Sequence, residues 1–74
     1  MKVKVTQEHI NKGLKGSSCY CPIALAIGPN CVVQYSHITI GNKEYRTPQA
    51  VFEFLHAFDN GLPVKPFEFE LNDS

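Results

Sequence analysis

Three cysteines and three histidines are the side chains of this 74-residue sequence best suited to bind a metal. Cys19, Cys21 and Cys31, together with one histidine, would supply the four ligands of a tetrahedral zinc ion. Structural zinc sites usually take their paired cysteines with roughly two to four residues between them, so that both thiolates reach the ion. Only one residue separates Cys19 from Cys21. We therefore expect packed thiols, no metal site and no cofactor.

Cys21 is also a candidate nucleophile. It directly precedes Pro22, and proline is favoured at the first position of a helix, where the dipole lowers the pKa of a thiol. His9 would be the base for this thiol. No third residue that would orient the base is recognisable in the sequence. We therefore expect no enzymatic activity and interpret the Cys-Pro pair as a packing and capping feature.

A loop of small polar residues, Gly16-Ser17-Ser18, leads toward the helix that Pro22 begins. Backbone N–H groups, hydroxyls and a positive dipole end are features that phosphate sites use. The loop is neither a Walker A nor a Gly-x-Gly-x-x-Gly motif, so an ordinary connector remains the alternative. Tyrosines would supply faces on which a base could stack, and basic residues would supply charge. The candidate ligand-binding residues are Lys12, Lys15, Ser17, Ser18, Tyr20, Tyr35, His37, Lys43, Tyr45 and Arg46.

The formal net charge of zero is a cancellation between two oppositely charged parts of the chain. Residues 1–46 contain six basic and two acidic residues, a net charge of +4, and residues 47–74 contain one basic and five acidic residues, a net charge of −4. Neutrality argues against a protein that coats nucleic acid or an anionic membrane. If the charged side chains of the first and last strands neutralise each other, the basic residues without an acidic partner are chiefly Lys12, Lys15, Lys43 and Arg46.

The first half of the chain predicts a strand and two short helices. Residues 2–5 alternate charged and β-branched residues, which is typical of a strand with one buried face. Thr6 is a candidate N-cap for a helix over residues 7–14, which Gly13 or Gly16 would end in the left-handed conformation. Residues 22–27 form a second, wholly apolar helix.

The second half predicts further strands and the main helix. Residues 31–40 are extended, but their apolar phase switches, which indicates a bulge or bend near Ser36 and His37. Gly41-Asn42 indicates a two-residue hairpin. Thr47 is the expected N-cap of a helix over residues 48–59, in which Phe52 falls outside the apolar stripe. The stripe consists of Ala50, Val51, Phe54, Leu55 and Phe58.

Phe52 and His56 lie side by side away from the core face, which indicates a second contact surface, either a dimer interface or a ligand site.

The first and last strands carry opposite charges. Lys2 and Lys4 lie on one, and Glu68 and Glu70 lie on the other, within a strand over residues 67–71. Opposite charges favour adjacent strands. We therefore predict one α+β domain over residues 1–74, with the order β-α-α-β-β-α-β. An antiparallel or mixed sheet of about four strands would carry the helices on one face. A chain this small also favours a homo-oligomer, at least a dimer.

Three segments together resemble a group of short bacteriophage and prophage proteins. They are Cys21-Pro22-Ile23-Ala24-Leu25-Ala26, Thr47-Pro48 with Phe58-Asp59-Asn60-Gly61, and Val64-Lys65-Pro66-Phe67-Glu68-Phe69. The resemblance spans nearly the whole chain and includes a Thr-x-x-His-Ile-like opening at residues 6–10. It brings no assignment of functional residues.

The resemblance implies a protein that acts in the cytoplasm of a host bacterium. Some phage anti-defence proteins are compact oligomers that sequester nucleotide second messengers. We expect a non-enzymatic sponge for a cyclic nucleotide or a molecule of the cyclic ADP-ribose type, with no membrane partner and no nucleic acid. The alternative is an adaptor or inhibitor that binds a host protein through Phe52, His56 and the acidic carboxyl-terminal face.

Overall fold

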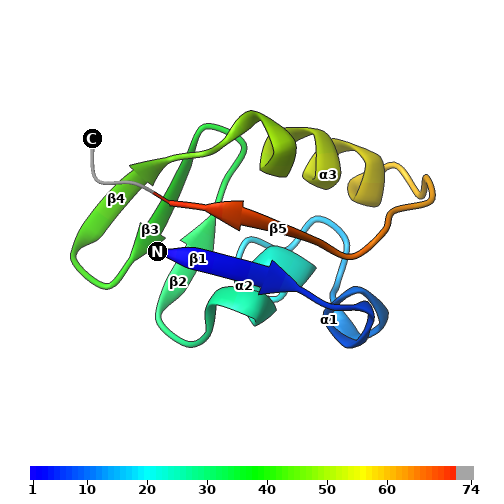
Figure 1. Cartoon of the computed structure of the whole chain (residues 1–74), viewed down its shortest axis with the longest axis horizontal. Helices are drawn as coiled ribbons and strands as arrows, with labels where there is room; N and C mark the ends of the chain where they lie inside the picture. The colour runs from blue at the N-terminus through cyan, green and yellow to red at the C-terminus, as the bar shows by residue number, and fades with distance from the viewer. Residues whose placement is uncertain (72–74) are drawn as a thin grey trace.

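Helices and strands follow one another in the predicted order, and the α+β class is confirmed (Figure 1). The structure is a computed structural model, and it describes residues 1–71. The expected extended segment over residues 31–40 is divided into two strands. The elements of the described part are β1 (Lys2–Val5), α1 (Gln7–Lys12), α2 (Pro22–Ile27), β2 (Cys31–Val33), β3 (His37–Ile40), β4 (Lys43–Arg46), α3 (Gln49–Asp59) and β5 (Phe67–Glu70).

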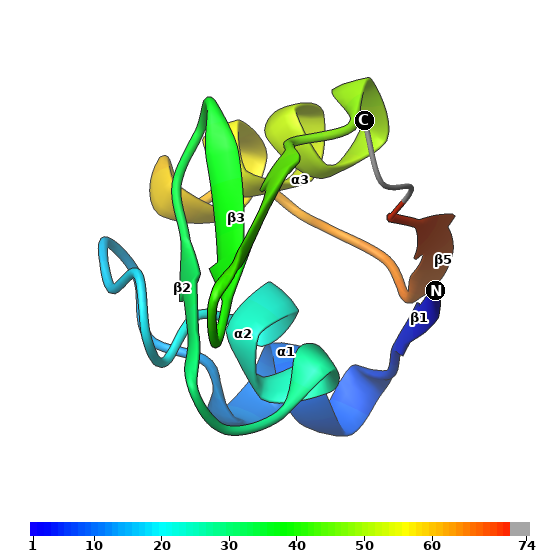
Figure 2. The same ribbon diagram turned by 90° about the vertical axis from the view of Figure 1, so that its left-hand side faces the viewer.

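The strands form two antiparallel sheets where a single sheet was expected. β1 pairs with β5, and β2, β3 and β4 form the second sheet in that order. Two short turns hold β2, β3 and β4 together, whereas helices separate them in sequence from β1 and β5. Figure 2 shows the two sheets facing each other, with α3 on one side and α1 and α2 on the other. The helices therefore do not share one face.

The predicted pairing of the terminal strands is confirmed. Lys2 lies opposite Glu70 and Lys4 lies opposite Glu68. The Lys2 ammonium is 3.7 Å from a Glu68 carboxylate oxygen, on the diagonal of this arrangement. Both side chains are solvent-exposed, so this ion pair contributes less than about 1 kcal/mol.

The switch of apolar phase near Ser36 marks a full reversal of the chain. Val33 lies opposite Ile38, and Gln34 donates its N–H to the His37 carbonyl at 2.8 Å, which closes a hairpin around Tyr35 and Ser36. Partners across such a turn differ by an odd number of residues. The odd-numbered buried residues of β2 are therefore continued by even-numbered residues on β3 without any change of face. The bend is where it was predicted, but it reverses the strand.

The two short helices meet at Gly13. The N–H of this residue donates to the His9 carbonyl, and its φ of −69° is not left-handed, contrary to our expectation. A Cβ on Gly13 would lie 2.5 Å from Cδ and Cγ of Pro22, so glycine is required here by close approach. The first helix ends at Lys12, and Leu14 is exposed.

Helix α3 begins without the predicted cap. Pro48 is its N-cap residue, and the Thr47 hydroxyl instead donates to the Gln34 carbonyl at 2.8 Å, which ties the helix entry to the β2–β3 turn. Ala50, expected in the apolar stripe, is exposed.

One hydrophobic cluster joins both sheets and α3. It includes the other four residues of the expected α3 stripe and the inward side chains of the terminal strands. The buried members are Val3, Val5, Cys21, Ile23, Ala24, Cys31, Val33, Ile38, Tyr45, Val51, Phe54, Leu55, Phe58, Phe69 and Leu71.

Over residues 1–71, no helix has the length and apolar character needed to cross a membrane.

Candidate functional site

Asp59 joins three separate parts of the chain at one end of α3. One carboxylate oxygen accepts the Gly16 N–H at 3.0 Å, and the other accepts the Tyr35 hydroxyl at 2.6 Å. Gly16 belongs to the loop between α1 and α2, and Tyr35 belongs to the β2–β3 turn. Asp59 therefore fixes both loops against α3. It also occupies the Gly16 amide that was a candidate donor to a phosphate.

A pocket of about 230 Å³ lies beside this junction, and we name it the Asp59 pocket. The predicted ligand-binding residues Ser17, Ser18 and Tyr35 line it. The Ser17 hydroxyl accepts the Tyr20 N–H at 3.0 Å, and the Ser18 carbonyl accepts the Val33 N–H at 2.8 Å. The Gly16-Ser17-Ser18 loop is therefore held by hydrogen bonds on both sides. The remaining lining residues are Gly16, Cys21, Val33, Gln34, Leu55 and Asp59.

Three rings form a row on the surface next to this pocket, and we name Tyr35, Phe52 and His56 the aromatic strip. The Tyr35 and Phe52 rings meet edge to face, with centroids 5.6 Å apart. The Phe52 and His56 rings are stacked, 6.5 Å apart and 16° from parallel. Tyr35 and Phe52 remain 43% and 40% exposed. The hydrogen bond to Asp59 raises the pKa of the Tyr35 hydroxyl, so this group is a neutral donor at physiological pH.

The predicted basic residues do not converge on the Asp59 pocket. Lys12 forms an ion pair with Glu8 at 3.0 Å on the exposed side of α1. We expected Lys12 to lack an acidic partner, and this expectation was wrong. Lys43 and Arg46 lie at opposite ends of β4, which separates their Cα atoms by roughly 10 Å. Lys15 adjoins the pocket residue Gly16 in sequence, and its ammonium would lie 3.3 Å from a Cβ at Gly61.

The remaining tyrosines lie apart from the aromatic strip. Tyr45 is buried in the core between the two sheets, so it offers no free face for stacking, contrary to our expectation. Tyr20 is 61% exposed and lines a second, broader hollow of about 670 Å³ with Cys19, Val32 and Asn42. His37 is exposed, within hydrogen-bond distance of the Ser36 hydroxyl, and lies opposite Arg46 on β4.

Cys21 is buried, and its thiol serves as the N-cap of α2, where it accepts the Ala24 N–H at 3.4 Å. Burial raises the pKa of this thiol, against the lowering expected at a helix N-terminus. Cys31 is also buried, and burial raises its pKa as well, whereas Cys19 is exposed. Within residues 1–71, no group of three His, Cys, Asp or Glu side chains is arranged to hold a metal ion.

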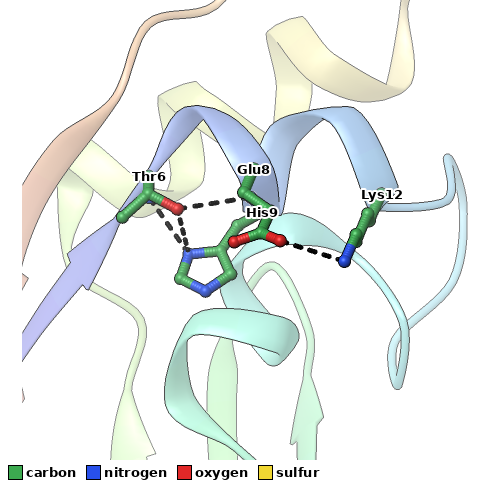
Figure 3. A network of polar contacts seen from close by, with 4 residues as sticks. All are labelled: Thr6, Glu8, His9 and Lys12. Atoms are coloured by element: carbon green, nitrogen blue, oxygen red, sulfur yellow. Dashed lines mark hydrogen bonds and ion pairs between the residues drawn. The ribbon is translucent and has the colours of Figure 1, made fainter.

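His9, the proposed base for Cys21, takes part in a capping box at the start of α1 (Figure 3). Its Nδ1 accepts the Thr6 N–H at 3.0 Å, while the Thr6 hydroxyl accepts the His9 N–H at 3.4 Å. A neutral ring that accepts at Nδ1 carries its hydrogen on Nε2 and has no second acceptor. His9 therefore stabilises the helix end, and the predicted N-cap at Thr6 is confirmed.

Asp59 and Gln34 are pocket residues that the sequence patterns do not single out. One signal does point to Asp59. A carboxylate in the last turn of a helix opposes the helix dipole, which indicates a partner elsewhere in the fold. Gln34 carries no comparable signal.

Comparison with family models, with curated proteins and with solved structures finds no match to this chain.

Proposed function

We propose that this chain is a non-enzymatic phage protein that binds and sequesters a nucleotide-derived signal of host defence, such as a cyclic nucleotide or a molecule of the cyclic ADP-ribose type. The observation that carries the proposal is the aromatic strip beside the Asp59 pocket. Exposed rings next to hydroxyl and carboxylate groups match the two halves of a nucleoside, a flat base and a sugar rich in donors.

Each group has a defined part in this proposal. The base stacks on Phe52 and Tyr35, a contact worth about 1–3 kcal/mol per base. A carboxylate has about four acceptor positions, and Asp59 uses two of them, so it can still accept a sugar hydroxyl or an exocyclic amine. Lys15 is the cation best placed to meet a phosphate.

The size of the pocket supports an oligomer in this role. Pockets that enclose a small molecule usually measure roughly 300–1,000 Å³. The Asp59 pocket, at about 230 Å³, is smaller and would leave part of a dinucleotide uncovered. A second subunit that covers the ligand would complete the site, in keeping with the expected homo-oligomer in the host cytoplasm.

Calorimetry with a panel of cyclic mononucleotides, cyclic dinucleotides and cyclic ADP-ribose tests the proposal. We expect one of them to bind with a Kd below about 10 μM, because effective sequestration requires tight binding. Phe52→Ala should weaken that binding about tenfold or more. Tyr20→Ala, which alters a more exposed ring outside the strip, should not. No binding by any ligand of the panel would refute the nucleotide proposal.

A second candidate function is binding of a host protein, and the exposure of Phe52 favours it. Large rings at the centre of an interface often dominate its affinity. The acidic residues Glu53, Glu68 and Glu70 are exposed and would favour a basic partner surface. A purified complex of defined stoichiometry that Phe52→Ala disrupts, in a protein that binds no nucleotide, would favour this function over the first.

A further inference from the structure

Strand β4 is one outer strand of the β2-β3-β4 sheet, and its unpaired edge can be located from the hydrogen bonds of β2. The Val33 N–H donates to the Ser18 carbonyl, so the backbone polar groups of Val33 point away from β3. Val33 lies opposite Ile38, and Ile38 lies opposite Tyr45. Hydrogen-bonded and non-hydrogen-bonded pairs alternate in antiparallel sheets, so Ile38 and Tyr45 bond to each other.

It follows that the residues on either side of Tyr45, Glu44 and Arg46, direct their N–H and C=O groups away from β3. Within residues 1–71, no other backbone group takes up these donors and acceptors. The Glu44 and Arg46 side chains are both exposed, on the face opposite the buried Tyr45 ring, and neither belongs to an ion pair in this part of the chain. The edge thus presents two hydrogen-bonding residues of opposite charge.

We propose that β4 pairs antiparallel with β4 of a second copy of this chain, so that Glu44 lies opposite the partner's Arg46 and Arg46 lies opposite the partner's Glu44. This register centres the two-fold axis on Tyr45, uses all four outward backbone groups of each strand, and sets opposite charges face to face on both sides of the axis. Shifting it by two residues sets Glu44 against itself or Arg46 against itself.

The other strand edges are less suited to pair with the same strand of a second copy. On the β2 edge, the Val33 N–H already donates to the Ser18 carbonyl. Met1 and Leu71 exchange hydrogen bonds, so the outward residues of β1 are Lys2 and Lys4, and those of β5 are Glu68 and Glu70. Pairing either strand with its own copy would oppose like charges, a device that keeps edges apart. Among the strands within residues 1–71, β4 alone has outward residues of opposite charge, Glu44 and Arg46.

The pairing would form one continuous sheet of six strands, β2-β3-β4 from each copy. An interface of two four-residue strands falls below the standard size, so the dimer should be reversible and depend on protein concentration. This inference rests on the proposed function in one respect only, which is that both expect a second copy of the chain. Its test uses the unliganded protein, so failure of dimerisation and failure of nucleotide binding are separate results.

Sedimentation velocity of Glu44→Arg, Arg46→Glu and the double reversal tests this register. We expect the parent protein to pass from 8.3 kDa toward twice that mass as its concentration rises. Each single reversal should raise the dissociation constant about tenfold or more, since it opposes like charges at two symmetric positions, and the double reversal should restore dimerisation. Circular dichroism checks that each variant is folded.

Glu68→Arg is the matched control, because it makes the same charge change on the β5 edge and should leave dimerisation unchanged. A parent protein that stays monomeric at all concentrations would overturn the proposal. So would a folded Glu44→Arg or Arg46→Glu variant that dimerises like the parent, or a double reversal that fails to restore the dimer.

Discussion

Asp59 is the residue on which the geometry of the candidate site depends. Its two carboxylate oxygens bind groups 43 and 24 residues away in sequence. The same carboxylate that positions Tyr35 therefore also shapes the loop that lines the pocket. At this scale the site is a structural junction with spare acceptor capacity, since two of its acceptor positions remain open to a ligand.

The hydrogen bond from Tyr35 to Asp59 predicts a pH-dependent contribution to stability. It raises the pKa of Tyr35 above its ordinary value of 10.0, because the neutral hydroxyl is the form that donates. Its stabilisation is therefore complete below about pH 10 and is lost as pH rises through the higher pKa of the folded state. Tyr35→Phe should lower the free energy of unfolding at pH 7 by at most about 1 kcal/mol, since the pair is exposed.

Urea unfolding of the parent and Tyr35→Phe proteins at pH 7 and pH 11 measures this contribution. The difference between the two proteins should shrink at the higher pH, because Tyr35 ionises and loses its hydrogen bond, whereas the titration of lysines and other tyrosines is common to both proteins and cancels. A difference that stays constant or grows would contradict the assigned hydrogen bond.

At the scale of elements, the end of α1 packs closely against the start of α2. Gly13 and Pro22 pack so closely that a methyl group cannot enter without movement of the proline ring or the backbone. This contact fixes the path of the loop over residues 13–21, which carries Ser17 and Ser18 to the pocket.

Gly13→Ala should lower the free energy of unfolding by about 1–3 kcal/mol, as overpacking commonly does. Asn11→Ala, at an exposed position of the same helix, should change it by less than about 0.5 kcal/mol. Thermal unfolding followed by circular dichroism compares them. Equal melting temperatures for Gly13→Ala and the parent would show that the junction relaxes freely.

Elements were predictable wherever their cause is local. Thr6 caps the helix that follows it, and Pro22 begins a helix. The pairing of β1 with β5 is the exception, because it is non-local and was predicted from the opposite charges of the two strands. Thr47 has the sequence context of a second N-cap, but its hydroxyl donates to the Gln34 carbonyl, 13 residues earlier in the chain. The division into two sheets is equally non-local. Sequence patterns define which face of a strand is buried, and they do not define which edge is paired.

The candidate site was predictable to a similar extent. Ser17, Ser18 and Tyr35 were expected and line one pocket, whereas Asp59 was not, because its partners come from distant loops. The basic residues do not gather at the pocket, and the reason is physical. A count of charges along the chain does not show that a neighbour four residues away, Glu8, already neutralises Lys12.

On the scale of the whole molecule, one core connects all the parts. Val3 and Phe69 from one sheet, Ile38 and Tyr45 from the other, and Val51 from α3 belong to a single buried cluster. Neither small sheet has a core of its own. We therefore expect the domain to unfold in one cooperative step.

Ile23→Val tests this cooperativity, because Ile23 is fully buried in α2. The loss of one methyl group should cost about 0.5–1.5 kcal/mol. Denaturation followed by far-ultraviolet circular dichroism and by tyrosine fluorescence, to which the buried Tyr45 contributes, should show the same reduced midpoint. Midpoints that separate between the two signals would indicate that the sheets unfold independently.

The pairing of β1 with β5 has a consequence for the order of folding. The turns that join β2, β3 and β4 close loops of two residues, which form within microseconds, whereas Val5 and Phe67 are separated by nearly the whole chain. Closing the longer loop costs more chain entropy and is repaid only after the intervening core has formed. β1 must therefore wait, without its partner strand, until the last strand has left the ribosome. During synthesis, the exposed Lys2 and Lys4 side chains would keep this waiting strand from pairing with copies of itself.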